Sequence, residues 1–83
     1  MIKISDIEIA STLHTLGIPI DGVFSSGNTN RYGEPIIECY FKKTKEVEEY
    51  IDGFYMDTLL VNPRQLLANR KDIIARMKAV KNV

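Results

Sequence analysis

The side chains of this chain that could do chemistry are mainly cations gathered near its end. Residues 63–83 carry six Lys and Arg against one acid, Asp72, whereas residues 1–62 carry five Lys and Arg against ten carboxylates. Eleven basic and eleven acidic residues cancel overall, yet the chain divides into a body of net charge −5 (5 − 10) and a segment of net charge +5 (6 − 1). Such a segment can dock on its own body, or it can recognise nucleic acid or a carboxylate-rich protein surface.

Four of these cations are candidates for binding nucleic acid, because phosphate neutralisation needs only cations clustered on one side of a helix. They are Arg64, Lys71, Arg76 and Lys78. The alternative is a solvated helix face, which is what a charge run usually forms. The pI of about 6.6 is well below that of a typical nucleic-acid-binding domain, and the sequence shows no aromatic motif for stacking bases.

Arg70 is the exception among the cations, because the helical period places it inside an apolar stripe. At 100° per residue it lies between Met77 and Ile74. A guanidinium in that position needs a partner. We expect either an ion pair with Glu48 or Asp52, or a groove edge where Arg70 meets a phosphate or a partner's carboxylate.

Segment 25–34 is the second candidate binding element. We expect it to be a polar hairpin connection longer than the usual two to five residues, and long polar loops are often functional. Arg31 and Tyr32 near its tip supply the side-chain types that concentrate binding energy at protein interfaces. We therefore predict Arg31, Tyr32, Arg70 and Arg76 as partner-binding residues, the alternative being a loop without a role.

Side chains suited to catalysis or metal binding are scarce. His14, the single histidine, lies beside an apolar stripe, and Cys39 alternates with apolar residues as a core thiol does. The acids of segment 46–49 are too tightly spaced to converge on one ion. Both common glycine-rich phosphate-binding motifs are missing. We expect no enzyme, no catalytic residue, no metal and no cofactor.

Length and composition predict one small globular domain over residues 1–83. The chain is 45% hydrophobic and 27% charged, which excludes a disordered polar chain. A single cysteine excludes an internal disulfide and fits a reducing compartment. No apolar run long enough for a membrane helix and no export leader are evident. We therefore expect a cytoplasmic protein.

The first half of the chain predicts a helix followed by a hairpin. Ser5–Glu8 reads as a capping box that starts a helix, and Gly17 suits its end. Segment 18–24 predicts an edge strand, bulged at Gly22. Segment 37–41 alternates apolar and polar residues as a half-buried strand does.

The second half predicts two helices joined by a short apolar piece. Thr44 is a suitable N-cap for a helix that reaches about Gly53, and segment 58–61 predicts a short third strand. Asn62 and Pro63 suit the N-cap and first turn of a final helix of about eighteen residues. Its predicted apolar stripe is Leu66, Leu67, Ile73, Ile74, Met77 and Val80. The order α-β-β-α-(β)-α implies an α+β domain, with a two- or three-stranded antiparallel sheet packed against helices.

Two stretches carry a resemblance to a known kind of protein. Asp6-Ile7-Glu8-Ile9-Ala10 with Leu13 and Gly17, and Val61-Asn62-Pro63-Arg64-Gln65-Leu66-Leu67, resemble the opening and closing motifs of short phage and prophage proteins of unknown function from low-GC Gram-positive bacteria. Tyr40-Phe41 matches the aromatic strand of that pattern. The long polar hairpin segment and Pro19 depart from it.

The resemblance implies a phage protein in a bacterial cytoplasm and assigns no catalytic residue. Small phage proteins without enzymatic motifs often act by occupying a host protein's surface. The leading hypothesis is therefore a protein-binding module that inhibits or modulates a host or defence protein. The alternatives are a nucleic-acid-binding accessory protein that uses the basic helix, and a structural homo-oligomer in which that helix pairs with a neighbour's acidic helix.

Overall fold

A three-stranded antiparallel sheet and three helices make up the computed structural model, which describes residues 1–82. The elements follow the order β1 (Ile2–Ile4), α1 (Ile7–Thr15), β2 (Gly22–Thr29), β3 (Pro35–Phe41), α2 (Lys45–Tyr55) and α3 (Pro63–Lys81). The predicted α+β class with a small antiparallel sheet is confirmed. Within the described residues, no helix combines the length and apolar character needed to cross a membrane.

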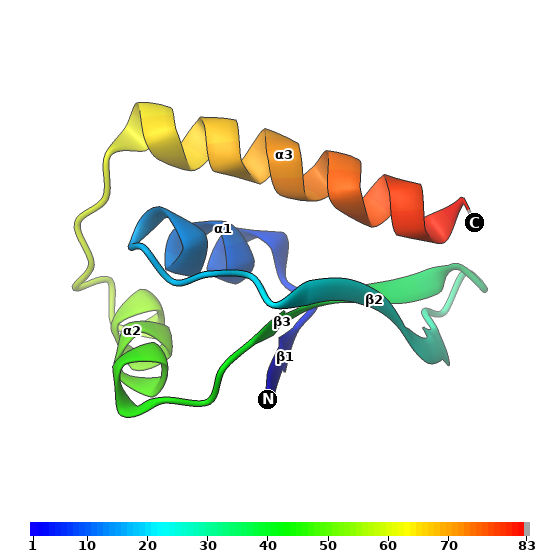
Figure 1. The fold of residues 1–83 in the computed structure, drawn as a ribbon, viewed down its shortest axis with the longest axis horizontal. Coiled ribbons are helices and arrows are strands. Elements are labelled where there is room, and N and C mark those ends of the chain that lie inside the picture. The colour runs from blue at the N-terminus through cyan, green and yellow to red at the C-terminus, as the bar shows by residue number, and fades with distance from the viewer. Residues whose placement is uncertain (83) are drawn as a thin grey trace.

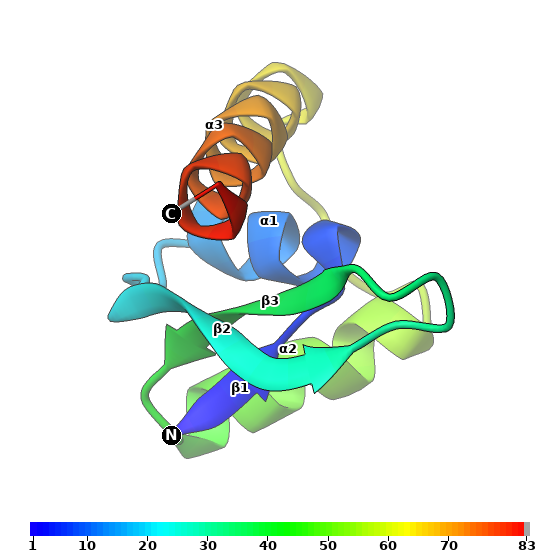
Figure 2. The ribbon, with the colours of Figure 1, turned by 90° about the vertical axis from the view of Figure 1, so that its right-hand side faces the viewer.

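The central strand of the sheet is β3, which pairs with β1 on one edge and β2 on the other. Cys39 lies opposite both Ile4 and Val23, which fixes the register of the two pairs. Figures 1 and 2 show α1 and α3 on the same side of the sheet, and α3 approaches β2 and β3 toward its C-terminal end. This is the helix-covered face; on the other face Lys3 and Phe24 are exposed, and we call it the open face.

The core lies between the covered face of the sheet and α1. Period-two alternation buries Ile37, Cys39 and Phe41 on that face of β3. Leu13 of α1 and Ile73 of α3 reach the same cluster and are fully buried. Because Ile73 enters the core directly, α3 is anchored to the body of the protein and is not a detached basic tail.

The first strand was not predicted, and it replaces the strand expected at 58–61. Ile2 and Ile4 flank Lys3, an alternation too short to recognise before its pairing with β3 is known. Segment 58–61 forms no strand because it connects α2 to α3 along the surface, where Leu60 is 94% exposed. The observed order is therefore β-α-β-β-α-α.

The start of α1 also differs from the prediction. Asp6, not Ser5, is the N-cap, and its carboxylate accepts from the Ile9 amide at 3.1 Å. Asp6 accepts from the amide three residues later, which is the capping role predicted for Ser5, so the N-cap lies one residue further along the chain than predicted. The expected end is confirmed, since Gly17 adopts a φ of +96° directly after the helix.

The predicted long loop at 25–34 is wrong, because β2 begins at Gly22 and continues to Thr29. The connection is a short turn, residues 30–34, which we call the hairpin tip. The Asn30 side chain accepts from the amides of Tyr32 and Glu34 and closes that turn. The irregularity in pairing falls between Ser25 and Thr29, not at Gly22.

The helix starts predicted for the second half are confirmed. Thr44 accepts from the Val47 amide at 3.1 Å, and Asn62 accepts from the Gln65 amide at 2.9 Å. The α2 helix continues through Gly53 to Tyr55. In α3 the predicted stripe is too wide, since Leu67 is 66% exposed while Ile73 and Met77 are buried.

Candidate functional site

The exposed side of α3 carries a regular pattern of cationic and aliphatic residues. Arg64, Lys71 and Lys78 recur every seven residues, and Leu67 and Ile74 lie between them at spacings of three and four. At 3.6 residues per turn these five positions lie along one side of the helix. We call this set, Arg64, Leu67, Lys71, Ile74 and Lys78, the exposed stripe.

The three cations of the exposed stripe make no ion pair within 4.0 Å to any residue that the structure describes. Lys71 and Lys78 are exposed, as is Leu67 beside them, and Ile74 is half-buried. The stripe therefore presents unpaired positive charge together with accessible aliphatic surface. Both are available to a partner without breaking a contact inside the protein.

Two other cations of α3 are paired with the acidic body. Arg70 lies 3.4 Å from Glu8 of α1, and Lys81 pairs with Glu34 of the hairpin tip. The Lys81 hydrogen bond and charge lower the pKa of the Glu34 carboxyl. Docking of the basic segment on the body therefore occurs, but it uses Arg70 in the middle of α3 and Lys81 at its end, and it leaves the exposed stripe free.

The predicted ion pair of Arg70 with Glu48 or Asp52 is wrong. Helix α1 lies between α2 and α3, and Arg70 pairs with Glu8 of α1 and not with the acids of α2. The Arg70 and Glu8 side chains are 44% and 60% exposed. Arg70 thus lies at the edge of the packed side and not inside the core.

Arg76 lies on a different side of α3 from the exposed stripe. Five residues after Lys71, it is rotated by about 140° around the helix axis. Its charge acts on Cys39, whose pKa is raised by burial and lowered in part by Arg76. Of the four cations predicted to bind nucleic acid, three therefore lie on the exposed stripe, and Arg76 lies on another side of α3.

The hairpin tip places Arg31 and Tyr32 together at the end of the molecule where α3 finishes. The Arg31 guanidinium carbon lies 4.9 Å from the centre of the Tyr32 ring, and the Tyr32 side chain is 70% exposed. The ion pair between Glu34 and Lys81 connects this tip to the last turn of α3. Of the predicted partner-binding residues, Arg31 and Tyr32 lie in contact, whereas Arg70 and Arg76 lie on separate flanks of α3.

A groove of about 460 Å³ separates the second half of α3 from the start of β3. Its lining is mostly aliphatic and includes Ile37, Ile74 and Met77, with Lys78 and Lys81 also contributing. Because Ile74 and Lys78 belong to both features, the groove continues the exposed stripe toward the hairpin tip.

The open face of the sheet carries an aromatic pair that the sequence did not reveal. Phe24 and Tyr40 meet edge to face with ring centres 5.0 Å apart, and Lys3 Nζ lies 5.4 Å from the centre of the Tyr40 ring. Phe24 is 51% exposed and covers Gly22, where an added Cβ would fall 2.2 Å from its ring. Alternation in β3 already placed Tyr40 on the open face, but the position of Phe24 depends on the strand register.

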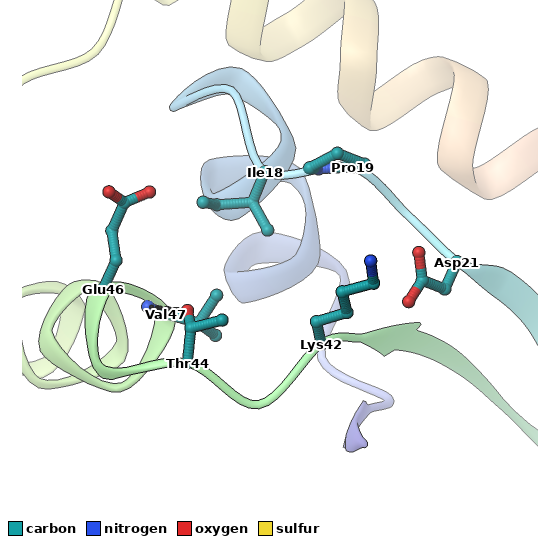
Figure 3. A pocket seen from close by; sticks show the side chains of 7 residues that line it. All are labelled: Ile18, Pro19, Asp21, Lys42, Thr44, Glu46 and Val47. Atoms are coloured by element: carbon teal, nitrogen blue, oxygen red, sulfur yellow. Dashed lines mark hydrogen bonds between the residues drawn. The ribbon is translucent and has the colours of Figure 1, made fainter.

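A second cavity, of about 300 Å³, lies between the α1–β2 and β3–α2 connections (Figure 3). Lys42 and Asp21 extend at one end and Glu46 lies at the other. The Thr44 hydroxyl in its wall accepts the Val47 amide. With charges of both signs and its hydroxyl already engaged, this cavity defines no class of ligand.

The two side chains considered for catalysis are His14 and Cys39. His14 Nδ1 lies 3.2 Å from the Ile18 carbonyl oxygen, and Cys39 is fully buried in the core. No three of the His, Cys, Asp and Glu side chains within residues 1–82 come together as metal ligands.

No family model, curated protein or solved structure matches this chain. The resemblance to short phage proteins stays a prediction.

Proposed function

We propose that this protein is a small, non-enzymatic protein-binding module whose binding surface is the exposed stripe of α3. The observation that carries the proposal is the seven-residue repeat of unpaired Arg64, Lys71 and Lys78 with accessible Leu67 and Ile74 between them. The partner whose shape and charge best match the exposed stripe is an acidic amphipathic helix.

The spacing favours a helix as the occupant. Residues that alternate at three and four positions form the seam along which two helices pack side by side. Leu67 and Ile74 would contact apolar residues of the partner, while the cations beside them would face its carboxylates. Complementary charge speeds association and sets specificity more than it adds affinity.

The phage resemblance suggests the setting for this activity. A module of this kind would act in the cytoplasm of a bacterial host by covering the acidic surface of a host or defence protein and so inhibiting or modulating it. The hairpin tip, with Arg31 and Tyr32, lies at the end of α3 and would extend the contact beyond the stripe.

A titration with defined peptides tests the proposal. The probe is a labelled amphipathic helical peptide with Glu beside its leucine seam, and the matched control is the same peptide with Lys in place of Glu. We expect the acidic peptide alone to bind, and Lys71→Glu to weaken binding about tenfold, or about 1.4 kcal/mol. Arg76→Glu, the same change on another side of α3, should leave affinity nearly unchanged. Equal binding of both peptides would refute the proposal.

Nucleic-acid binding is the second candidate, and the open face of the sheet favours it. Phe24 and Tyr40 offer aromatic surface next to Lys3, and bases stack on such surfaces in single-stranded complexes. Against this, Glu38 lies directly opposite Phe24 on the same face and would repel phosphates. Labelled single-stranded DNA at low salt tests this candidate. Binding that weakens steeply with salt and is lost in Phe24→Ala would support it.

A further inference from the structure

The α2 helix exposes a surface whose chemistry complements the exposed stripe. Glu48, Asp52 and Tyr55 follow each other at spacings of four and three, so they lie on one side of α2. All three are exposed, Tyr55 to 72%, and neither carboxylate is ion-paired with a residue that the structure describes. We call these three residues the acidic face.

The acidic face and the exposed stripe do not meet within one molecule. Helix α1 lies between α2 and α3, which occupy separate parts of the fold (Figures 1 and 2). The only ion pair that the structure gives α2 within the described residues is the local one between Lys45 and Glu49. Any contact between the two surfaces must therefore join two copies of the chain.

We propose that the acidic face of α2 from a second copy of this chain occupies the exposed stripe. This inference rests on the proposed function, because it names the partner of the same surface. It makes the protein self-associate through unlike surfaces, α2 of one copy against α3 of the next.

The spacings of the two surfaces agree in one register. When the helices run parallel, the steps of four and three from Glu48 to Tyr55 match those from Leu67 to Ile74. Asp52 then faces Lys71 and Tyr55 faces Ile74, while Glu48 falls at the level of Leu67, which Arg64 and Lys71 flank along the stripe. A charged pair and an apolar pair thus form side by side, without leaving a carboxylate against a carboxylate.

A contact between two identical α3 helices is much less favourable. The same seam would place cations near cations, since Arg64, Lys71 and Lys78 hold every seventh position. A contact between two acidic faces suffers from the same repulsion. Only the mixed pairing removes both charge conflicts, and the surfaces therefore select unlike association.

The contact is small, so the association is weak. Helix α2 has 11 residues and is about 16 Å long at 1.5 Å per residue. One such helix covers about three of the five positions of the exposed stripe. Because stable interfaces bury more surface than three helical turns provide, we expect a dissociation constant of about 100 µM.

Sedimentation velocity on the full chain, from about 10 µM to about 1 mM in low salt, tests the inference. We expect the average mass to rise with concentration toward twice the monomer mass or beyond, and salt to reduce it. Lys71→Glu and Asp52→Lys should each weaken association about tenfold. The double variant Lys71→Glu with Asp52→Lys should restore it, because the facing charges are exchanged. Circular dichroism confirms that each variant is folded.

The control is Arg76→Glu, which changes the same charge on the same helix away from the exposed stripe. Equal weakening by Arg76→Glu and Lys71→Glu would overturn the inference, as would a double variant that stays as weak as the single ones. A chain that remains monomeric at every concentration but still binds the acidic peptide refutes self-association alone. A chain that does neither refutes the proposed function as well.

Discussion

Ile73 of α3 should contribute more to stability than any other aliphatic residue of that helix. Its side chain is fully buried against α1 and the sheet, whereas its neighbour Ile74 is half-buried and Leu67 is 66% exposed. Ile73→Ala removes packed methyl and methylene groups and leaves a cavity. We expect a loss of about 3 kcal/mol in the free energy of unfolding, within the usual range of about 2–5 kcal/mol for such a change.

The loss expected for Ile73→Ala is a large share of the total free energy of unfolding. At about 0.05–0.15 kcal/mol per residue, a chain of 83 residues is stable by about 4–12 kcal/mol. With an unfolding entropy of about 2.1 cal/mol/K per residue, the melting temperature should fall by about 17 °C. Ile74→Ala should cost about half as much, and Leu67→Ala less than about 0.5 kcal/mol.

Thermal and urea unfolding followed by circular dichroism measure these differences. The three variants change the same helix by similar volumes, so their order reports burial and not helix propensity. If Leu67→Ala destabilised the protein as much as Ile73→Ala, the assignment of the buried side of α3 would be refuted, and the exposed stripe with it.

Three further predictions concern charge and reactivity. In a carbon-13 NMR titration, Glu34 should titrate below its reference pKa of 4.5, and in Lys81→Ala its pKa should return toward that value. Because the pKa of Glu34 is lowered on folding, the stability that this carboxylate contributes is present above pH 4.5 and is lost as the pH falls through the folded pKa. The Cys39 thiol should react with a disulfide reagent at least about tenfold faster in urea than in buffer, because burial both covers the thiol and raises its pKa, and equal rates would contradict a closed core. Arg70→Ala should cost less than about 1 kcal/mol in urea unfolding, because the pair with Glu8 is exposed to solvent on both sides, whereas a larger loss would indicate a buried pair.

Local signals allowed much of the fold to be predicted. Thr44, Asn62 and Gly17 mark helix ends through side-chain or backbone properties that act within a few residues. The alternation around Cys39 likewise showed which side chains of β3 are buried. These features depend on nearest neighbours along the chain, and they were read correctly.

Features that depend on distant contacts were missed. The strand at Ile2–Ile4 exists because β3 offers it an edge, and the extension of β2 to Thr29 exists because the hairpin pairs past its irregular stretch. Arg70 pairs with Glu8, which is 62 positions away in the chain, and not with the acids of α2. The helical period gave the angular position of Arg70 on α3 correctly, but it could not show which helix packs beside that position.

The candidate surface was partly visible in the sequence. The excess of cations at the end of the chain pointed to α3, but treating Leu67 as a core residue hid the seam that it forms with Lys71 and Ile74. Only the packing of α3 on α1 shows which side of the helix remains free. Phe24 on the open face was missed for the same reason, since its position follows from strand register.

The most direct test of the central claim is an NMR titration of the nitrogen-15-labelled protein with the acidic amphipathic peptide. We predict that the amide signals shifting most, and by amounts that saturate, belong to Arg64, Leu67, Lys71, Ile74 and Lys78, with smaller changes at the hairpin tip. Shifts centred on Phe24 and Tyr40, or no saturable shift at all at about 1 mM peptide, would contradict the claim that the exposed stripe of α3 is a protein-binding surface.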